Sequence, residues 1–538
     1  MKPNKHIERR IVIGLIVSET YISQVKKFWD IQVLQSSMAQ SIATWCIEYH
    51  DKYNKAPNRN IESIYIQKLK DGKLNPDDAE ELEQDILPGL SEEYDRELFN
   101  TQYLLDQTKA YFRERQLTIY TDQIQTMVKK GDLSDAETLA LNFKPISDGV
   151  QKDVELSSPE ALTRIENAFL MSEKPIITYP GAFGRFINSQ LVRGGFIGFL
   201  GMEKVGKTWI LMELSIHACK GGANVAFFQA GDMTEEQQLR RIAISIAGKS
   251  DKQKYCKNIK IPVLDCGRNF SDNCERPERK SKNCINEKID PYQVFSTLKK
   301  MCENQDALKE LLEKFQDYTP CGLEKCQDFV GSVWFKKVAD DSPLTVEQAQ
   351  ASVKSFFKPI GKIIKKRRGR YKLSTYYNGT LSIQEIRSCL DKWEKEDNFI
   401  PDVIIIDYMD LLIDHHKDEY RHRQNELWKG GRLISQERHA LVITATQANA
   451  GSYNTDLLEL SNYSEDKRKY SHVTAMYGLN RDKKGVEKKM GITRINELLI
   501  RDGASSVGKQ ICVLQALQKG KAFLGSFVDR TPNNMKGK

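Results

Sequence analysis

The chain has 538 residues, of which 40% are hydrophobic and 29% charged, with a formal net charge of +8. This length predicts two or three domains, and this composition is typical of a globular protein. No run approaches the roughly 18 apolar residues of a membrane helix, which excludes a membrane-spanning protein and predicts a cytoplasmic one. The modest positive charge is compatible with a nucleic-acid partner without requiring one.

Residues 1–145 predict an all-helical N-terminal domain. Apolar residues recur at helical spacing in IERRIVIGLIVSETYISQVKKF and in YLLDQTKAYFRERQLTIYTDQIQTMV, and PNRN, GKLNPDD and LPGLS separate the helices. The opening MKPNKHIERR followed by IVIGLIV imitates a secretory signal. However, the apolar run is seven residues long and no small-residue cleavage site follows it, so it is expected to form the first amphipathic helix of this domain.

The character of the sequence changes after the polar linker expected at 146–174. From 175 to 530, strand-like runs alternate with helical patterns, which predicts a mainly parallel α/β sheet. The runs are FIGFLG, NVAFFQAG, PDVIIIDY and ALVITATQ. The last nine residues, RTPNNMKGK, are typical of a disordered tail.

The stretch GMEKVGKTW at 201–209 follows the first strand-like run and matches the phosphate-binding pattern G-x-x-x-x-G-K-T. Its glycines let backbone N–H groups turn toward an anion, and the following helix adds the positive end of its dipole. A chance match is the alternative, but the strand before and the amphipathic WILMELSIHACK after argue against it. A nucleotide is therefore the expected ligand of Gly201, Met202, Glu203, Lys204, Val205, Gly206, Lys207, Thr208 and Trp209.

Two of these residues have specific expected roles. Lys207 can reach the β- and γ-phosphates, and the Thr208 hydroxyl is suited to hold Mg²⁺. Asp232 follows the run NVAFFQAG at another sheet edge, where a carboxylate can polarise the attacking water. Aspartate also caps helices well, so an N-cap before TEEQQ is the alternative for Asp232.

Residues 250–372 interrupt the alternation and predict an insertion that projects from the sheet. Seven of the eleven cysteines fall between 256 and 326, which in a cytoplasmic protein favours metal over disulfides. Four thiolates suit tetrahedral Zn²⁺, although free buried cysteines are the alternative. The expected ligands are Cys274, Cys284, Cys321 and Cys326, and Cys266 could substitute for either of the first two. The basic run KKRRGRYK at 365–372 is a weaker candidate for nucleic acid.

Two further strand ends carry polar residues. Asp407 ends VIIID, where a carboxylate next to the phosphate loop can order Mg²⁺ and its waters, with a turn-capping role as the alternative. Gln447 ends LVITATQ, where an amide can sense the γ-phosphate and transmit its state to the following loop, unless it makes only a strand-end hydrogen bond.

In order along the chain, these motifs resemble those of DnaB-type replicative helicases, of the kind that bacteriophages encode. GMEKVGKT resembles the family's first motif, VAFFQAGDM the one that usually reads FFSLEM, and IIIDYMDLL the segment IIVDYLQLM. ITATQAN is similar to the glutamine motif and RINELLIRDGASSVGK to the segment with the arginine finger. The helical region at 1–145 is similar to the family's N-terminal domain, so the resemblance covers most of the chain except 250–372.

The resemblance implies a RecA-like ATPase core in a ring of six subunits that uses ATP and Mg²⁺ to travel along single-stranded DNA and unwind duplex at a replication fork. Arg501 would reach the γ-phosphate held by a neighbouring subunit, whereas an exposed surface arginine is the alternative. The basic loop SEDKRKYSH at 464–472 would face the central channel, where Lys467, Arg468 and Lys469 bind DNA phosphates, unless it is only a solvated charge run. A primase and a helicase loader are candidate partners in the bacterial host's cytoplasm.

Two positions depart from the family pattern. Asp232 stands where the family has glutamate and is one methylene shorter. Leu499 stands two residues before the finger, where the family often has lysine. These departures imply slow hydrolysis or help from another cation. They leave a non-catalytic, nucleotide-gated DNA-binding or loader protein as an alternative, beside a filament-forming RecA-type strand-exchange ATPase.

Overall fold

A computed structural model describes most of the chain. The described residues are 5–70, 100–133, 135–136, 139, 156, 161–162, 165, 174–257, 259–276, 279, 289–359, 368–413, 420–462, 469–501 and 509–530. The chain divides into two compact units, Met1–Ser172 and Glu173–Lys538. Most of the linker expected at 146–174 lies outside the described residues. None of the described helices is long and apolar enough to cross a membrane.

In the first unit, the described residues form helices and connecting loops, with no strand among them. Its helices are α1 Lys5–Val17, α2 Glu19–Val25, α3 Ser37–Tyr53, α4 Asn60–Lys70 and α7 Thr101–Lys130. Ser18, Ser36 and Asn100 cap α2, α3 and α7, because each side chain accepts a hydrogen bond from a backbone N–H in the first turn. The run Ile11–Val17 is buried along its length and packs with α3 and α7, so it is the core of a folded unit.

The second unit is built on a nine-stranded sheet with the order β11-β10-β9-β8-β1-β7-β6-β2-β5. Its strands are β1 Phe196–Gly201, β2 Val225–Gln229, β5 Tyr371–Thr375, β6 Val403–Asp407, β7 Leu441–Gln447, β8 Ala475–Asn480, β9 Ile492–Ile500, β10 Gln510–Ala516 and β11 Lys521–Phe527. The strands from β8 to β5 pair in parallel, whereas β9, β10 and β11 continue the sheet antiparallel.

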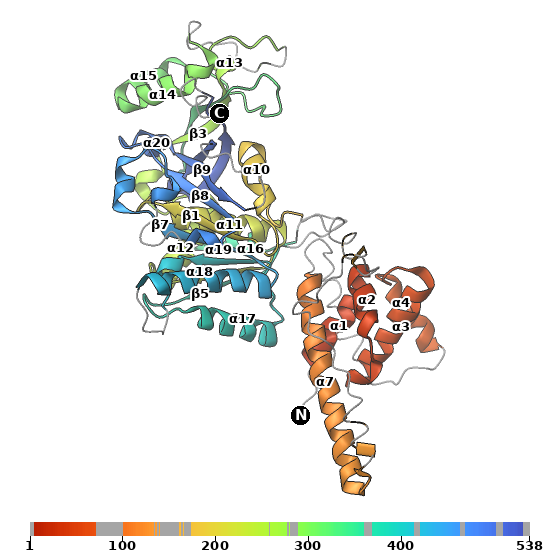
Figure 1. Ribbon diagram of the computed structural model, residues 1–538. Coiled ribbons are helices and arrows are strands. Elements are labelled where there is room, and N and C mark those ends of the chain that lie inside the picture. Colours follow the sequence, from red (N-terminus) through yellow and green to blue (C-terminus); the bar gives the residue numbers. More distant parts are fainter. Residues whose placement is uncertain are drawn as a thin grey trace. The chain divides into compact units, whose positions relative to one another are not determined.

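Helices cover both faces of this sheet (Figure 1). On one face α17 and α18 bury Ile386 and Trp428 against Phe196 and Phe228 of the strands. On the other, α10 and α11 pack on strands that include β2, β6 and β11. The described α-helices of the second unit are α10 Gly181–Ile187, α11 Lys207–Gly221, α12 Glu235–Ala247, α13 Gly267–Phe270, α14 Val294–Glu303, α15 Gln305–Lys314, α16 Val346–Phe356, α17 Ile383–Asp397, α18 Tyr420–Glu437, α19 Lys469–His472 and α20 Val486–Met490.

The fold class expected from the sequence is confirmed: a mixed, mostly parallel α/β sheet with a helical N-terminal region. The four strand-like runs correspond to β1, β2, β6 and β7. In the sheet order, β7 lies between β1 and β6. The strand that precedes the phosphate loop and the strand that ends at Asp407 are therefore separated by a single strand.

The segment 250–372 is more closely integrated than a projecting insertion. Its strands β3 Ile259–Cys266 and β4 Gly331–Val338 form a separate antiparallel hairpin. The hairpin and helices α13 to α15 lie beyond the antiparallel end of the sheet (Figure 1), and Phe295 and Trp334 share a core with Met490 and Leu514, which follow β8 in the chain. Helix α16 packs on α12, and Tyr371 and Lys372, expected at the insertion's edge, belong to β5 of the main sheet.

Candidate nucleotide-binding site

The phosphate loop connects β1 to α11 at the carboxyl edge of the parallel strands. Gly206 caps α11 with φ of +107°, a conformation that an L-residue rarely adopts, and Lys204 is also left-handed at φ +58°. A side chain at Gly201 would come within 2.7 Å of the Val205 side chain. The two glycines are therefore required by the loop's geometry, and the first turn of α11 opens directly onto it.

Lys207 is held by its own loop. Its Nζ donates to the carbonyl oxygens of Gly201 at 2.9 Å and Met202 at 3.1 Å, and it lies 5.6 Å from the centre of the Tyr408 ring. Burial lowers the pKa of Lys207, whereas the nearby carboxylates of Asp410 and Asp407 oppose that shift. Among the described residues, the hydrogen-bond acceptors of this ammonium are carbonyl oxygens, and a phosphate oxygen could replace one of them.

Thr208 and Asp407 meet across the strand tips. The Thr208 hydroxyl donates to Asp407 Oδ1 at 3.2 Å, and the Asp407 side chain is fully buried. Burial raises the pKa of Asp407 to about 7, against the hydrogen bond from Thr208 that lowers it. The second oxygen, Oδ2, is buried without a hydrogen-bond partner in the described part of the chain.

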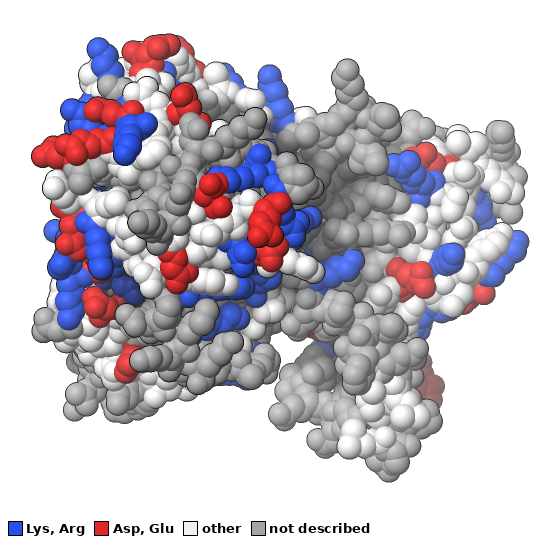
Figure 2. All heavy atoms as spheres, turned by 90° about the horizontal axis from the view of Figure 1, so that it is seen from above, with Lys and Arg blue, Asp and Glu red and all other residues white. Residues whose placement is uncertain are grey.

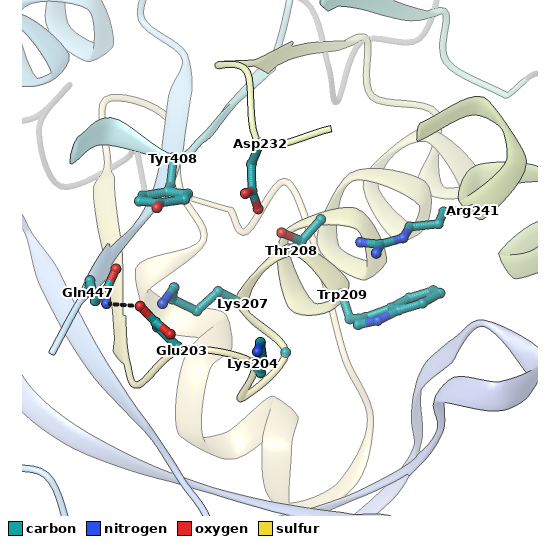
Figure 3. Close-up of a pocket in the computed structure, with 10 residues that line it drawn as sticks. Glu203, Lys204, Lys207, Thr208, Trp209, Asp232, Arg241, Tyr408 and Gln447 are labelled. Atoms are coloured by element: carbon teal, nitrogen blue, oxygen red, sulfur yellow. Dashed lines mark hydrogen bonds between the residues drawn. The ribbon is translucent and has the colours of Figure 1, made fainter. Parts of the chain in front are cut away.

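Asp232 reaches the same place from β2. It follows Gly231, whose φ is +100° and whose added Cβ would lie 2.3 Å from the backbone of Asn378. Figure 3 shows the Asp232 carboxylate directed toward Thr208. The helix that follows is capped by Thr234 in a capping box with Gln237, so the N-cap role considered for Asp232 belongs to Thr234.

Gln447 is connected to the phosphate loop by its side chain. Register pairs Gln447 with Gly201, and its Nε2 donates to Glu203 Oε1 at 3.0 Å (Figure 3). Its backbone N–H donates to Asp410 Oδ2 at 2.9 Å, and the same oxygen accepts from the Thr446 hydroxyl at 2.7 Å. Asp410 thus fixes the end of β7 opposite the loop, a role that the sequence analysis missed.

The structure also adds cations that the sequence analysis did not single out. Arg241 on α12 lies over the Trp209 ring, with its Cζ 5.3 Å from the ring centre (Figure 3). Arg481, just after β8, donates from Nη1 to the Lys204 carbonyl at 3.4 Å, and burial lowers its pKa. Neither arginine belongs to the phosphate-loop motif. Their position beside the loop follows from the strand order, in which β8 lies on one side of β1 and β2 lies on the other, and the sequence alone does not give that order.

These residues line a pocket of about 450 Å³, whose lining includes Glu203, Lys207, Thr208, Asp232, Arg241, Tyr408 and Gln447. A neighbouring pocket of about 450 Å³ shares Trp209, Asp232 and Arg241 with it and continues to Tyr255 and Gln518. Together they have the size of a small-molecule site. The second unit is a mixed, mostly parallel α/β fold that carries a phosphate loop between β1 and α11.

The donor set fits a magnesium nucleotide. Mg²⁺ prefers hard oxygen ligands and keeps several waters, so it needs few protein oxygens. The unpartnered buried oxygen of Asp407 and the Thr208 hydroxyl beside it provide such oxygens at the mouth of the loop. The residues that would hold the ion are therefore the two expected from the sequence.

Arg501 lies at the opposite end of the strands. It follows β9, and its backbone N–H donates to the carbonyl of Thr474 at 2.9 Å, just before β8 begins. Because β8 runs parallel to β1, this is the amino edge of the sheet, away from the phosphate loop. The exposed guanidinium also donates to the carbonyl of Ser471. Arg501 cannot reach the nucleotide of its own subunit from there.

The structure describes only some of the basic residues that are candidates for DNA binding. Lys467 and Arg468, and the side chain of Lys469, lie outside the described residues. In the run 365–372, Arg370 donates to the carbonyl of Asp397 at 2.8 Å, and Lys372 forms an ion pair with the Asp397 carboxylate, so these two groups serve the fold. On the face shown in Figure 2, the described basic side chains are interspersed with acidic ones.

The structure describes three of the four expected zinc ligands, and also Cys266. Cys284 lies outside the described residues, whereas Cys274, Cys321 and Cys326 are partly exposed and Cys266 is buried. Among the described residues, no group of three or more His, Cys, Asp or Glu side chains forms a ready-made metal site.

Comparison with known proteins finds similarity in solved structures alone. No protein-family model and no curated protein matches the chain. A structure described as an ATPase domain aligns with a TM-score of 0.42 at 12% identity, covering 70% of this chain and all of its own. A structure described as a DnaB-like replicative helicase and its interactions with primase aligns with a TM-score of 0.42 at 12% identity, covering 97% of this chain and all of its own.

Proposed function

We propose that this chain is an ATP-driven, ring-forming DNA helicase of the DnaB type, which moves along single-stranded DNA and separates duplex at a replication fork. The observation that carries the proposal is the division of the catalytic residues between two edges of one sheet. Lys207, Thr208 and Asp407 meet at the carboxyl edge, whereas Arg501 stands exposed at the amino edge. A subunit of this kind needs a neighbour to complete its site.

Within one subunit the residues divide the chemistry as follows. Lys207 leaves the Gly201 and Met202 carbonyls to bind a phosphate oxygen, and α11 directs its first N–H groups at the same anion. Thr208 and ionised Asp407 would hold Mg²⁺, which would offset the negative charge of the phosphates. Asp232 accepts the proton of the attacking water. Arg501 of the neighbour neutralises charge that develops on the γ-phosphate.

The chain compensates in part for the shorter carboxylate at 232. In the pattern FFSLEM the glutamate is three residues after the second phenylalanine, whereas Asp232 is four residues after Phe228. The additional residue and the turn at Gly231 come just before Asp232, whose carboxylate is directed toward Thr208 (Figure 3). Asp232→Asn should therefore abolish hydrolysis while nucleotide binding persists, and Asp232→Glu should not restore a faster rate.

The link from nucleotide to DNA runs through the end of β7. The hydrogen bond from Gln447 to Glu203, at 3.0 Å, would break when a γ-phosphate occupies the loop, because the amide then has a new acceptor. The residues after Gln447 lead to the basic loop expected to contact DNA at 464–472. We expect Gln447→Ala to lower the stimulation of ATP turnover by single-stranded DNA more than the basal rate.

A non-catalytic, nucleotide-gated loader is the second candidate, and the exposure of Asp232 favours it. The deciding experiment measures ATP turnover with and without single-stranded DNA, together with unwinding of a forked duplex and negative-stain imaging with an ATP analogue. Six-membered rings with DNA-stimulated turnover and unwinding support the helicase. Nucleotide-dependent DNA binding without turnover supports the loader, and filaments support a strand-exchange ATPase. A primase or a loader protein is the class of partner to test on the rings.

A further inference from the structure

The neighbouring pocket of about 450 Å³, here called the second pocket, is built by stretches of chain that are distant in sequence. It shares Trp209, Asp232 and Arg241 with the pocket at the phosphate loop, so one ligand can extend from the first into the second. The rest of its lining comes from α12 and the turn before it, from residues 250–255 of the cysteine-rich segment, and from the 3₁₀ turn η10 Leu517–Lys519.

The second pocket begins on the side of the phosphate loop that is remote from Gln447. In Figure 3, Trp209 and Arg241 lie on one side of Thr208, whereas Gln447 and Lys207 lie on the other. Trp209 follows Thr208 directly, in the first turn of α11. The proposed mechanism places the γ-phosphate beside Gln447. The ribose and base of the nucleotide must then leave the loop past Trp209, toward the second pocket.

One wall of the second pocket is formed where η10 is held against α12. Gly520 follows η10 with φ of +70°, and an added Cβ would lie 2.7 Å from the backbone of Ser245 in α12. The side chain of Leu517 lies 4.0 Å from the position of a Cβ on Gly206, the N-cap of α11. Leu517 therefore presents apolar surface directly beside the phosphate loop.

Another wall is supplied by the cysteine-rich segment. Asp251 forms an ion pair with Arg240 of α12 at 2.5 Å, and the Asp251 side chain is only 15% exposed. The preceding residue, Ser250, is buried, and its carbonyl accepts a hydrogen bond from the Leu344 N–H at 2.8 Å. These contacts fasten the start of the segment to the nucleotide-binding side of the sheet, and Tyr255 lines the pocket there.

This lining is suited to a nucleobase and its ribose. Trp209 and Tyr255 supply aromatic rings, and Ile244 and Leu517 supply apolar surface. Bases stack on aromatic side chains whatever their identity, because every base has a π-face. Gln518 adds an amide with both a donor and an acceptor, which is what the polar edge of a base requires.

We propose that the second pocket binds the nucleoside part of the nucleotide, and that Tyr255 of the cysteine-rich segment and Gln518 of η10 contact the base. The identity of the ligand rests on the proposed function, whereas its place in the second pocket does not depend on turnover or unwinding. The segment 250–372, which the motif resemblance does not cover, thereby takes part in nucleotide binding through its first residues.

The test compares two ligands that share a pair of phosphates and differ in the nucleoside. Mg²⁺-ADP and Mg²⁺-pyrophosphate are titrated calorimetrically into the full-length protein, and an ATPase hydrolyses neither. The wild type should bind ADP about tenfold or more tightly than pyrophosphate, because only ADP reaches the second pocket. Equal affinities would overturn the proposal and leave the proposed function in place. Failure to unwind DNA with this difference intact would count against the proposed function alone.

Variants then identify the contacts. Tyr255→Ala should weaken ADP binding about tenfold and leave pyrophosphate binding unchanged, because stacking on the base is lost and the phosphate contacts remain. Gln518→Ala, on another wall, should act in the same direction and serves if Tyr255→Ala does not fold. Tyr292→Ala is the matched control, at a partly exposed tyrosine of the same segment outside the described lining of both pockets, and should bind ADP as wild type does. If the two pocket variants weaken both ligands equally, or weaken neither, the second pocket does not hold the nucleoside.

Discussion

At the scale of single residues, Lys207 decides whether the pocket can hold a triphosphate. In the nucleotide-free chain its ammonium has carbonyl oxygens of its own loop as hydrogen-bond partners. Lys207→Ala should abolish ATP turnover and weaken nucleotide binding, yet leave the melting temperature within a few degrees, because both lost bonds only close the short loop between the adjacent elements β1 and α11. Turnover assays, nucleotide titration and thermal unfolding check this.

Lys220→Ala provides the matched control for Lys207→Ala. Lys220 is an exposed lysine in the last turn of the same helix, remote from the phosphate loop. Its removal should leave turnover near the wild-type rate. Substantial turnover in pure, folded Lys207→Ala would show that catalysis occurs elsewhere.

Asp407 makes stability depend on pH. Its pKa is raised from the ordinary 3.8 to about 7, so the folded chain binds more protons than the unfolded chain between those values. Stability of the nucleotide-free protein should therefore fall as pH rises from about 4 to about 7, at about 1.4 kcal/mol for each unit of pKa shift. Asp407→Asn removes this contribution, so its melting temperature should exceed that of wild type increasingly as pH rises.

The same carboxyl group makes binding respond in the opposite direction. Mg²⁺ requires the ionised form, so the affinity for Mg²⁺-ATP should increase as pH rises through about 7. Asp341→Asn, at an exposed aspartate of the same unit, should leave both pH profiles unchanged. Parallel melting curves for wild type and Asp407→Asn at all pH values would contradict the assignment.

At the scale of elements, the sequence predicted those strands whose ends carry the chemistry. Phe196–Gly201 and Val403–Asp407 are buried at every position, and such continuous apolar runs followed by glycine or aspartate are typical of central parallel strands. The edge strand β5, Tyr371–Thr375, was hidden in a basic run because its Lys372 is neutralised by Asp397, a residue of another element. Pairing of that kind depends on the tertiary fold.

In the candidate site, the residues within local motifs were predictable from the sequence, whereas the residues placed by the fold were not. Lys207, Thr208 and Asp407 are identified by local motifs, and they meet as expected. Arg241 and Arg481 belong to no motif; they reach the loop because α12 and β8 lie beside it in the fold. Likewise, Tyr255 lies in the second pocket because the cysteine-rich segment packs on α12, which no motif reveals.

Gly231 is the element-scale determinant of where Asp232 lies. An alanine there would be strained by φ of +100° and would also place its Cβ 2.3 Å from the backbone of Asn378. Gly231→Ala should destabilise the unit and lower ATP turnover by about tenfold or more, since the loop must shift and the carboxylate moves with it. Thermal unfolding and turnover assays measure the two effects.

Gly379→Ala is the control that separates backbone strain at a positive φ from a steric clash of the added Cβ. Gly379 also has positive φ, +72°, but nothing lies within 4 Å of an added Cβ. It should therefore cost only the about 1–2 kcal/mol of a left-handed L-residue and leave turnover nearly normal. Equal effects of the two substitutions would mean that contact with Asn378 does not position Asp232.

At the scale of the whole molecule, the proposed mechanism requires residues from two copies of the second unit. The pocket at its carboxyl edge is lined by the phosphate loop and by the carboxylates of Glu203 and Asp232, and its described lining also includes the cations Lys204, Lys207 and Arg241. The exposed Arg501 is at the other edge, bonded to the carbonyl of Ser471. Head-to-tail contact between copies would bring one edge to the other, and repetition of that contact closes a ring when the rotation permits.

This arrangement predicts complementation between two inactive variants. Arg501→Ala should bind ATP nearly normally and still assemble, yet hydrolyse about a thousandfold more slowly, as expected when a finger in trans is removed. Lys207→Ala subunits bring an intact Arg501 and lack the phosphate contact. In mixed assemblies, an Arg501→Ala subunit binds ATP with its own Lys207 and receives Arg501 from a Lys207→Ala neighbour. Such a site has both groups, so turnover should rise above the sum of the separate variants. Subunit exchange is verified by energy transfer between labelled copies; if exchange occurs and no added turnover appears, Arg501 does not act in trans.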